Sequence, residues 1–303
     1  MVRNMRGAVL TLLALFALAA CGGNTDNPVD NSGKPADNGT VIVGSANFTE
    51  NVLLAEIYAA ALEAKGVKVE RKLNIGSREV IYKQLESGGL SVLPEYNGAL
   101  LSYLDKTNAA ATTAEVNTAL KGKLPAAVEL LDSAKAEDKD SVTVTKETAT
   151  KYNLKSIADL GPVAKDLVIG GPPEFKTRRQ GIVGLKEVYG LEFKDFRSLD
   201  VAGPVTVSAL KKGDIQAANL FSTDPALEVN DFVALDDPKA LFGAQNVTPI
   251  VNKAVGEKAR TVLNSIAPKL DTATLTQLMR KVSVDKQDPD KVAKEWLKSV
   301  GLA

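Results

Sequence analysis

Apolar and polar residues alternate along the chain in a pattern that predicts strands and helices in turn. After a polar N-terminal stretch, the pattern predicts strand, helix, strand, helix and strand at residues 40–46, 51–66, 67–73, 78–89 and 90–96. The first helix should end at Gly66, where a left-handed cap is easiest. Such a series favours a parallel sheet covered by helices, with a ligand crevice at the carboxyl ends of the strands.

A second series of the same kind follows and then turns back. It predicts strands at 141–145 and 166–175, a helix at 178–190 and a helix, turn and strand over 205–225. After 245–251 the chain is helical to its end, with a capped final helix over 288–301. We therefore expect an α/β protein of two lobes with a cleft between them, lobe 1 from residues 40–141 plus 247–303 and lobe 2 from 142–246.

The stretch SVLPEYNGALLSYL, residues 91–104, enters as a strand and leaves as a helix. This change of period places Tyr96 at a strand-to-helix junction. Because α/β proteins hold ligands at such junctions, Tyr96 is a candidate cleft residue. The alternative is a buried core ring with a satisfied hydroxyl.

The N-terminus predicts an export signal with a lipid anchor. Arg3 and Arg6 precede an apolar segment that ends in Leu-Ala-Ala-Cys, which resembles a lipobox with Cys21 as the lipidated residue. Residues 1–20 are then a signal peptide too short to span a membrane, and residues 21–39 a flexible tether rich in Gly, Asn and Asp. We expect the mature protein outside the cytoplasm, held at the bacterial cell membrane by several acyl chains.

Composition excludes several kinds of chemistry. The chain contains no histidine and a single cysteine, so imidazole-dependent catalysis, histidine-bound zinc and disulfides are ruled out. The formal charge is zero and becomes −2 once Arg3 and Arg6 are removed, which argues against a nucleic-acid partner. The segment VIGGPPEF lacks the lysine and serine or threonine of a phosphate-binding loop. No cofactor and no metal is expected.

Residues 44–98 resemble the N-terminal lobe of the glycine betaine, choline and carnitine binding proteins of compatible-solute ABC importers. The segments GGPPEFKTRRQGIVGLKEVYGLEFKDF, ALKKGDIQAANLFSTDPAL and NVTPIV resemble the second lobe and return strand of that family, in the same order. The resemblance covers residues 40–303. It implies a type II periplasmic-binding-protein fold that closes on a solute by a hinge and presents it to a permease and its ATPase. We expect a monomer.

The resemblance implies an aromatic cage for a quaternary ammonium group, in which ring faces attract a cation that cannot donate hydrogen bonds. Tyr96 matches one cage tyrosine. The other positions depart from the family: Phe221 and Gln245 stand where tyrosines are usual, and Asp140 lies at or near a third cage position. Asp140 would offer a full negative charge to a cation, or is alternatively a solvated residue of a charged run.

The family's carboxylate-binding positions also differ. Ala46 and Ala99 stand where a lysine and a threonine are usual, which leaves Arg178 to fork onto a carboxylate. The alternative for Arg178 is a solvated residue at a helix start. Asn47 and Thr223 follow predicted strands and are further cleft candidates, whereas Thr49 and Glu50 are expected to cap the helix that follows them.

The sequence leaves two alternative classes of function, an extracytoplasmic enzyme and a structural lipoprotein. An extracytoplasmic enzyme such as a hydrolase would need two converging carboxylates, and candidates are Glu95, Asp224 and the Asp236-Asp237 pair. Asp224 before Pro225, and Asp236-Asp237 before Pro238, are also typical of turns. A structural lipoprotein without a ligand would not require two α/β lobes with a cleft. The prediction is therefore a solute-binding lipoprotein for a small organic osmolyte, and not an enzyme.

Overall fold

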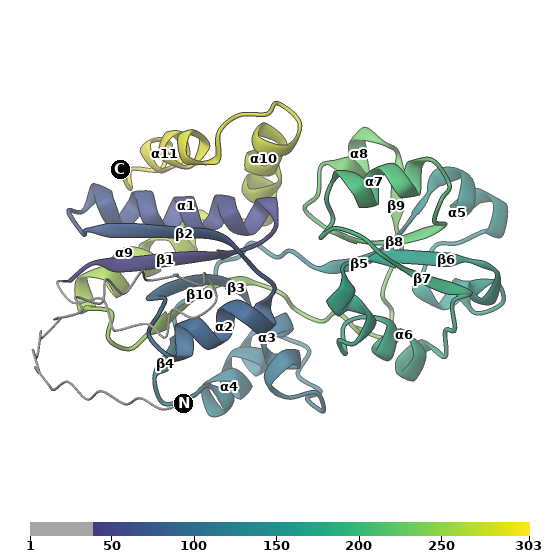
Figure 1. Cartoon of the computed structure of the whole chain (residues 1–303), viewed down its shortest axis with the longest axis horizontal. Helices are drawn as coiled ribbons and strands as arrows, with labels where there is room; N and C mark the ends of the chain where they lie inside the picture. The colour runs from purple at the N-terminus through teal and green to yellow at the C-terminus, as the bar shows by residue number, and fades with distance from the viewer. Residues whose placement is uncertain (1–38) are drawn as a thin grey trace, which may run out of the picture. The chain divides into compact units, whose positions relative to one another are not determined.

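The computed structural model describes residues 39–303, which form two β-sheets, each with parallel and antiparallel strands and each flanked by helices (Figure 1). The predicted signal peptide, the lipidated Cys21 and nearly all of the predicted tether lie outside the described residues. Within residues 39–303 there is no helix with the length and apolar character that a membrane span requires.

The first sheet contains strands from both ends of the described chain. Its order is β2-β1-β3-β10-β4, with bounds Val69–Gly76, Val41–Ala46, Val92–Tyr96, Val247–Asn252 and Val128–Leu130. Strand β1 pairs in parallel with β2 and β3, as predicted, whereas β10 pairs antiparallel with β3 and β4. The complete sheet is mixed, because β10 enters after the second sheet and runs in the opposite direction.

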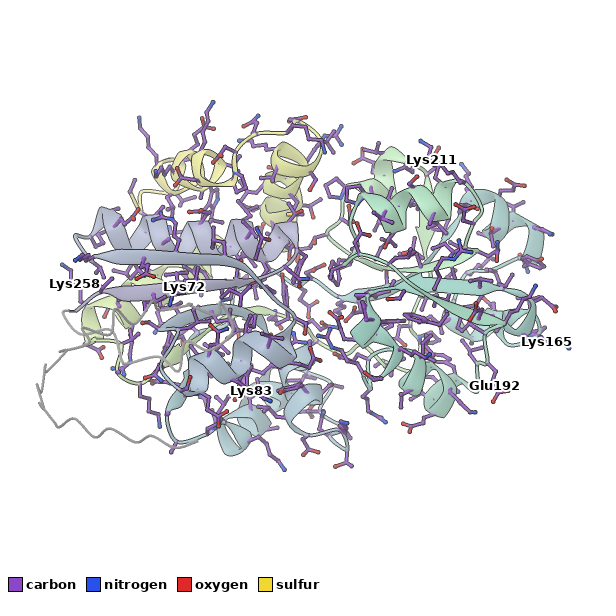
Figure 2. All side chains as sticks on the ribbon, in the orientation of Figure 1. Lys72, Lys83, Lys165, Glu192, Lys211 and Lys258 are labelled. Atoms are coloured by element: carbon purple, nitrogen blue, oxygen red, sulfur yellow. The ribbon has the colours of Figure 1, made fainter. Side chains whose placement is uncertain are left out.

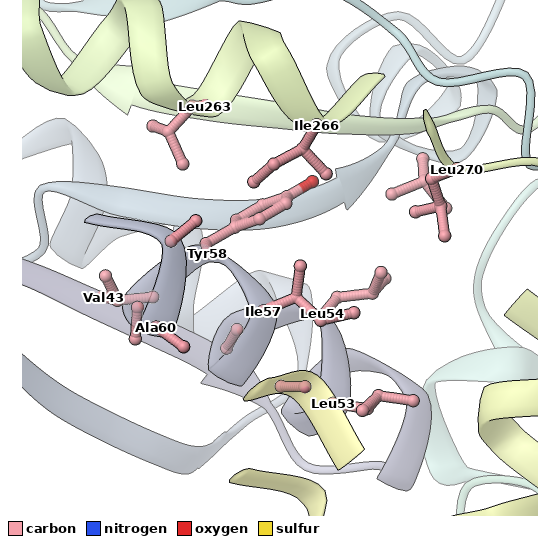
Figure 3. Close-up of a cluster of buried hydrophobic side chains, with 14 of the residues drawn as sticks. Val43, Leu53, Leu54, Ile57, Tyr58, Ala60, Leu263, Ile266 and Leu270 are labelled. Carbon is pink, nitrogen blue, oxygen red and sulfur yellow. The ribbon is translucent and has the colours of Figure 1, made fainter. Parts of the chain in front are cut away.

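Helix α1 (Thr49–Ala64) is enclosed on nearly all sides. It packs against α9 (Glu257–Ile266), α10 (Thr272–Ser283) and α11 (Pro289–Ser299), and Figure 3 shows Tyr58 of α1 beside Ile266 within this core. The alanine-rich and leucine-rich sequence of α1 suits this position, because a helix that is apolar all round belongs in the interior. The other face of the sheet is covered by α2 (Arg78–Glu86), α3 (Asn97–Leu104) and α4 (Thr113–Lys123).

The second sheet repeats the arrangement of the first. Its order is β7-β6-β8-β5-β9, with bounds Asp195–Ser198, Val168–Gly171, Ala217–Phe221, Asp140–Thr145 and Phe232–Ala234. Strand β6 pairs in parallel with β7 and β8, whereas β5 is antiparallel to β8 and β9. Its helices are α5, α6, α7 and α8, at Lys146–Tyr152, Ile182–Tyr189, Pro204–Lys211 and Ala226–Val229.

Two crossing segments join the sheets, residues 131–139 and 235–246. They lie antiparallel to each other at a bridge between Glu137 and Asn246. The amide of Asp138 donates to the carbonyl of Gln245 at 3.1 Å, and the amide of Val247 donates to the carbonyl of Ala136 at 3.0 Å. Both connections therefore run through one short ribbon, which is the arrangement expected of a hinge.

Helix ends agree with the sequence at some places and differ at others. Asp288 caps α11 by accepting hydrogen bonds from the amides of Asp290 and Lys291, as predicted, and Gly190 ends α6 in the left-handed region. Helix α1 is different, because its N-cap is Phe48 and no side chain caps it. Charged side chains such as those of Lys83, Lys165, Lys211, Lys258 and Glu192 are exposed at the surface (Figure 2).

Candidate functional site

A cavity of about 50 Å³ lies where the crossing segments meet strand ends of both sheets. It is lined by all of the predicted ligand-binding residues except Thr223, namely Asn47, Tyr96, Asp140, Arg178, Phe221 and Gln245. Tyr96 ends β3 and Phe221 ends β8, so both rings stand at the carboxyl ends of strands, where the sheet topology favours a ligand. Asp140 begins β5 and lies opposite Phe221 in the antiparallel ladder.

Three aromatic rings meet at this cavity. The Phe48 ring lies 6.1 Å from the Tyr96 ring at an interplanar angle of 29°, and 5.2 Å from the Phe221 ring at 41°. Phe48 therefore joins the two predicted rings into one aromatic wall. Sequence reasoning missed Phe48, although it lies between a strand and a helix, which is the same kind of junction that identified Tyr96.

The Tyr96 hydroxyl is committed to a protein partner. It donates a hydrogen bond to Oε1 of Glu50 at 2.7 Å, and the side chain of Tyr96 is buried. Burial, together with the negative charges of Glu50 and Asp138, raises the pKa of Tyr96 well above its ordinary value. The phenol thus stays protonated and fixes the ring, whose face remains the part available to a ligand.

Asp140 is a partly buried carboxylate at the cavity. Its Oδ1 accepts a hydrogen bond from Nδ2 of Asn219 at 2.9 Å. Burial raises the pKa of Asp140, and the hydrogen bond from Asn219 and the charges of Arg178 and Arg78 partly offset that effect. The carboxylate of Asp140 thus lines the cavity and bonds within the protein, and its role as a ligand contact stays a prediction.

Both arginines that line the cavity form bidentate ion pairs with glutamates. Arg78 donates to the two carboxylate oxygens of Glu95 at 2.8 Å each, and both side chains are almost fully buried. Arg178 donates in the same way to the two oxygens of Glu79 at 2.9 Å each. Arg178 belongs to the segment that follows β6 and Glu79 to α2, so this ion pair joins the second sheet region to the first.

Apart from these two arginines, the lining of the cavity contains no positively charged side chain. Ala46 and Ala99 both line the cavity, with 7% of each residue exposed. Their methyl groups cannot donate to a carboxylate. Gln245 is buried and its Nε2 donates to the carbonyl of Phe242 at 3.1 Å. The backbone amide of Asn47 donates to the carbonyl of Gly76 at 3.2 Å, so its side chain is held at the end of β1.

Thr223 lies beside the cavity, between two buried carboxyl groups. Its hydroxyl is within hydrogen-bond distance of Oε2 of Glu50 and, at 2.8 Å, of Oδ1 of Asp138. Burial raises the pKa of Glu50, and burial together with the charge of Glu50 raises the pKa of Asp138 well above its ordinary value. Since the hydroxyl has only one proton to donate, we infer that one of the two carboxyl groups holds a second proton.

The role expected for Glu50 was therefore wrong. Its side chain does not cap α1 but turns inward, because the buried hydroxyls of Tyr96 and Thr223 give it hydrogen bonds that solvent would otherwise supply. The carboxylates considered for an enzyme have structural partners. Glu95 is paired with Arg78, Asp224 accepts from the amide of Ala226 in a turn, and Asp237 bonds the hydroxyl of Tyr189.

Two sheets of this topology with a cavity at their strand ends define a two-lobed solute-binding protein of the type II periplasmic class. The family model for the substrate-binding domain of ABC-type glycine betaine transport systems matches residues 39–299, and the chain belongs to that family. Its members are extracytoplasmic substrate-binding proteins, not enzymes, and they bind small solutes for a permease and an ATPase. Among residues 39–303 no group of three or more Asp, Glu or Cys side chains is placed to hold a metal ion.

Two curated relatives show the extent of the similarity. The chain is 28% identical over 277 residues to the glycine betaine-binding protein YehZ of Escherichia coli, covering 86% of this chain and 90% of the relative. It is also 28% identical over 277 residues to a glycine-betaine-binding protein of Pseudomonas aeruginosa, covering 86% and 87%. A crystal structure of a glycine betaine/carnitine/choline ABC transporter protein has the same fold, with a TM-score of 0.65, 23% identity, and coverage of 86% of this chain and 99% of that one.

Proposed function

We propose that this chain is the lipid-anchored solute receptor of an ABC importer and that it captures a quaternary-amine cation between its lobes. The observation that carries the proposal is the wall of Phe48, Tyr96 and Phe221 beside the carboxylate of Asp140. Ring faces and a carboxylate both attract a cation that cannot donate hydrogen bonds. Cys21 would anchor the receptor, and the loaded lobes would dock on the permease.

The charges at the cavity support a cation more than a zwitterion. The guanidinium groups of Arg78 and Arg178 are already paired with glutamates, and Ala46 and Ala99 supply no donor. To replace its water, a ligand carboxylate would find only the guanidinium N–H groups left outside these ion pairs and neutral donors such as the Asn47 side chain, which is unfavourable. It would also meet the negative charge of Asp140. We therefore propose that choline, which has no carboxylate, binds more tightly than glycine betaine.

Entry of a solute requires the cavity to widen. About 50 Å³ is far below the 300 to 1,000 Å³ that is typical of sites for organic ligands. The lobes, proposed as residues 40–141 plus 247–303 and residues 142–246, would separate about the two crossing segments. Gln245 and Thr223 would then contribute to the site only in the closed arrangement, since Gln245 lies in a crossing segment and Thr223 lies two residues after β8.

The test is calorimetric titration of the purified protein with choline and with glycine betaine, repeated on Asp140→Asn. The substitution keeps the shape of the side chain and removes its charge. Choline binding should weaken by on the order of 2 kcal/mol, about 30-fold, because a close charge pair is lost. Glycine betaine binding should weaken less or improve, so the preference for choline narrows.

The matched control is Asp166→Asn, an exposed aspartate beside β6 of the same sheet and away from the cavity, which should leave both affinities unchanged. Tighter binding of glycine betaine than of choline by the unmodified protein would contradict the proposed preference. Failure of every quaternary amine to bind would reject the proposed function.

A further inference from the structure

A second and much larger cavity adjoins the first. Its volume is about 410 Å³, and it shares Phe48, Phe221 and Val201 with the smaller cavity, so the two phenylalanine rings form a partition between them. The smaller cavity has the charge of Asp140 on its side of the partition. The larger one has the start of α1, the helices α7 and α8, and the C-terminal end of α10 around it.

Apolar side chains make most of the wall of the larger cavity. Val207 comes from α7, Val229 from α8, and Met279 and Val282 from α10. Val229 is 55% exposed, although it is a large apolar residue. Exposed apolar groups gathered around one hollow are typical of a surface that binds an apolar group.

Two carboxyl groups, those of Glu50 and Asp224, also line the larger cavity. Glu50 is buried and bonded to Tyr96 and Thr223, and burial raises its pKa. Burial raises the pKa of Asp224 to about 6. The remaining charged side chain in this wall is that of Lys286, which follows α10. The interior of the cavity is thus lined by valine, methionine and phenylalanine, with its carboxyl groups engaged at one end.

We infer that the larger cavity receives an apolar extension of the bound cation, so that the preferred ligand is a trimethylammonium compound with an alkyl or aryl tail. The head would occupy the smaller cavity beside Asp140, and the tail would pass the rings of Phe48 and Phe221 to reach Val207 and Val229. This inference rests on the proposed function, because the head group must bind first. It extends the ligand class from compact osmolytes to longer amphiphilic cations.

The volumes decide between a tail and a second independent solute. The larger cavity has room for several methylene groups or a ring, whereas the smaller one must widen to admit even the head and has no space for a tail. A free second solute would lose its own translational freedom on binding, and a tail attached to the head does not. Because both cavities are lined by the rings of Phe48 and Phe221, a tail that passes these rings moves directly from the smaller cavity into the larger one.

The experiment measures the affinity of the purified protein for tetramethylammonium and for butyl-, hexyl- and octyltrimethylammonium by calorimetry, below the concentration at which the longest cation forms micelles. Each methylene that enters the cavity should strengthen binding about fourfold, the equivalent of about 0.8 kcal/mol. The gain should stop once the cavity is full. Affinity that does not rise from tetramethylammonium to hexyltrimethylammonium would overturn the inference and leave the proposed function standing.

A cavity-filling variant locates the tail. Val229→Trp places a large ring at the cavity wall at a position exposed enough to tolerate it. It should abolish the gain per methylene and leave tetramethylammonium binding unchanged. The matched control is Val80→Trp, at a valine that is 50% exposed on α2 and lines neither cavity. A gain per methylene that survives in Val229→Trp would place the tail elsewhere and overturn the inference. Failure of the unmodified protein to bind any of these cations, tetramethylammonium included, would overturn both proposals.

Discussion

Two of the side-chain contacts between the first sheet region and the second differ in the charge that they require. The Glu79–Arg178 contact is an ion pair with side chains 38% and 29% exposed. The Glu50–Thr223–Asp138 contact is a cluster of buried carboxyl groups around one hydroxyl. The first needs its carboxylate charged, and the second needs a proton on one of its carboxyl groups.

The two contacts therefore respond to pH in opposite directions. Burial alone would raise the pKa of Glu79, but the hydrogen bonds and charge of Arg178 outweigh it and lower that pKa to about 2. The stabilisation from Glu79 is therefore present above its ordinary pKa of 4.5 and is lost as pH falls towards 2. For Glu50 the pKa is raised, so its stabilisation is present below 4.5 and is lost as pH rises through the higher value.

The largest expected effect comes from removing the hydroxyl of the buried cluster. Thr223→Val keeps the shape of the side chain and leaves the carboxyl groups of Glu50 and Asp138 without their shared donor. The free energy of unfolding at pH 7 should fall by about 2 to 3 kcal/mol, because buried charged groups lose a hydrogen bond. Urea unfolding followed by circular dichroism measures it.

Thr143→Val is the matched control, since Thr143 is equally buried and its hydroxyl bonds only to the neutral Ser141. It should cost about 1 kcal/mol. Equal losses in the two variants would show that the buried carboxyl groups do not depend on Thr223.

A smaller effect that depends on pH is expected for Glu50→Gln. Glutamine resembles the protonated form and cannot ionise, so the variant avoids the charge that the unmodified protein must bury as pH rises. The melting temperature of Glu50→Gln relative to the unmodified protein should therefore increase as pH rises above 4.5. Calorimetric melting across this range gives the measurement.

The same substitution at Glu63, also on α1, should give the opposite trend. The hydrogen bond from Arg71 lowers the pKa of Glu63, so Glu63→Gln loses stabilisation at high pH and little at low pH. Parallel pH profiles for the two variants would disprove the assignment of a proton to the buried cluster.

The smallest effect on stability is expected at the exposed ion pair. Glu79→Gln should lower the free energy of unfolding by no more than about 1 kcal/mol, and 1 M salt should remove the difference, because exposed ion pairs are screened. The variant should still weaken choline binding severalfold if the pair holds the lobes closed. Calorimetric titration at low and high salt measures this.

Glu187→Gln is the control for this comparison, because Glu187 forms an exposed ion pair with Arg179 within the second lobe. It should have a similar small effect on stability and none on choline affinity. An equal loss of affinity in both variants would contradict a role for Glu79 in closure.

Local sequence signals were sufficient for the elements and for several positions at the cavity. The strand-to-helix junction at Tyr96 is a local feature, and the structure brings its ring to the cavity. Family resemblance added Phe221, Asp140, Gln245 and Arg178, which also line it. These assignments as ligand contacts remain predictions.

The missed features are those that depend on contacts distant in sequence. The pairing of Arg178 with Glu79 joins residues 99 positions apart, and the bond between Glu50 and Thr223 joins residues 173 apart. No local pattern distinguishes an inward-turning Glu50 from a helix cap. Phe48 was within reach of the sequence, because its junction has the same form as that of Tyr96.

The position of β10 in the first sheet also sets an order of assembly. The second sheet is contiguous, from Asp140 to Ala234, so all of its strands are available once that stretch has been made. The first sheet has β10, residues 247–252, between β3 and β4, and α11 packs on α1. A chain emerging from its N-terminus can therefore complete its second lobe before its first, and the first lobe waits with an unfilled gap until the last helices arrive.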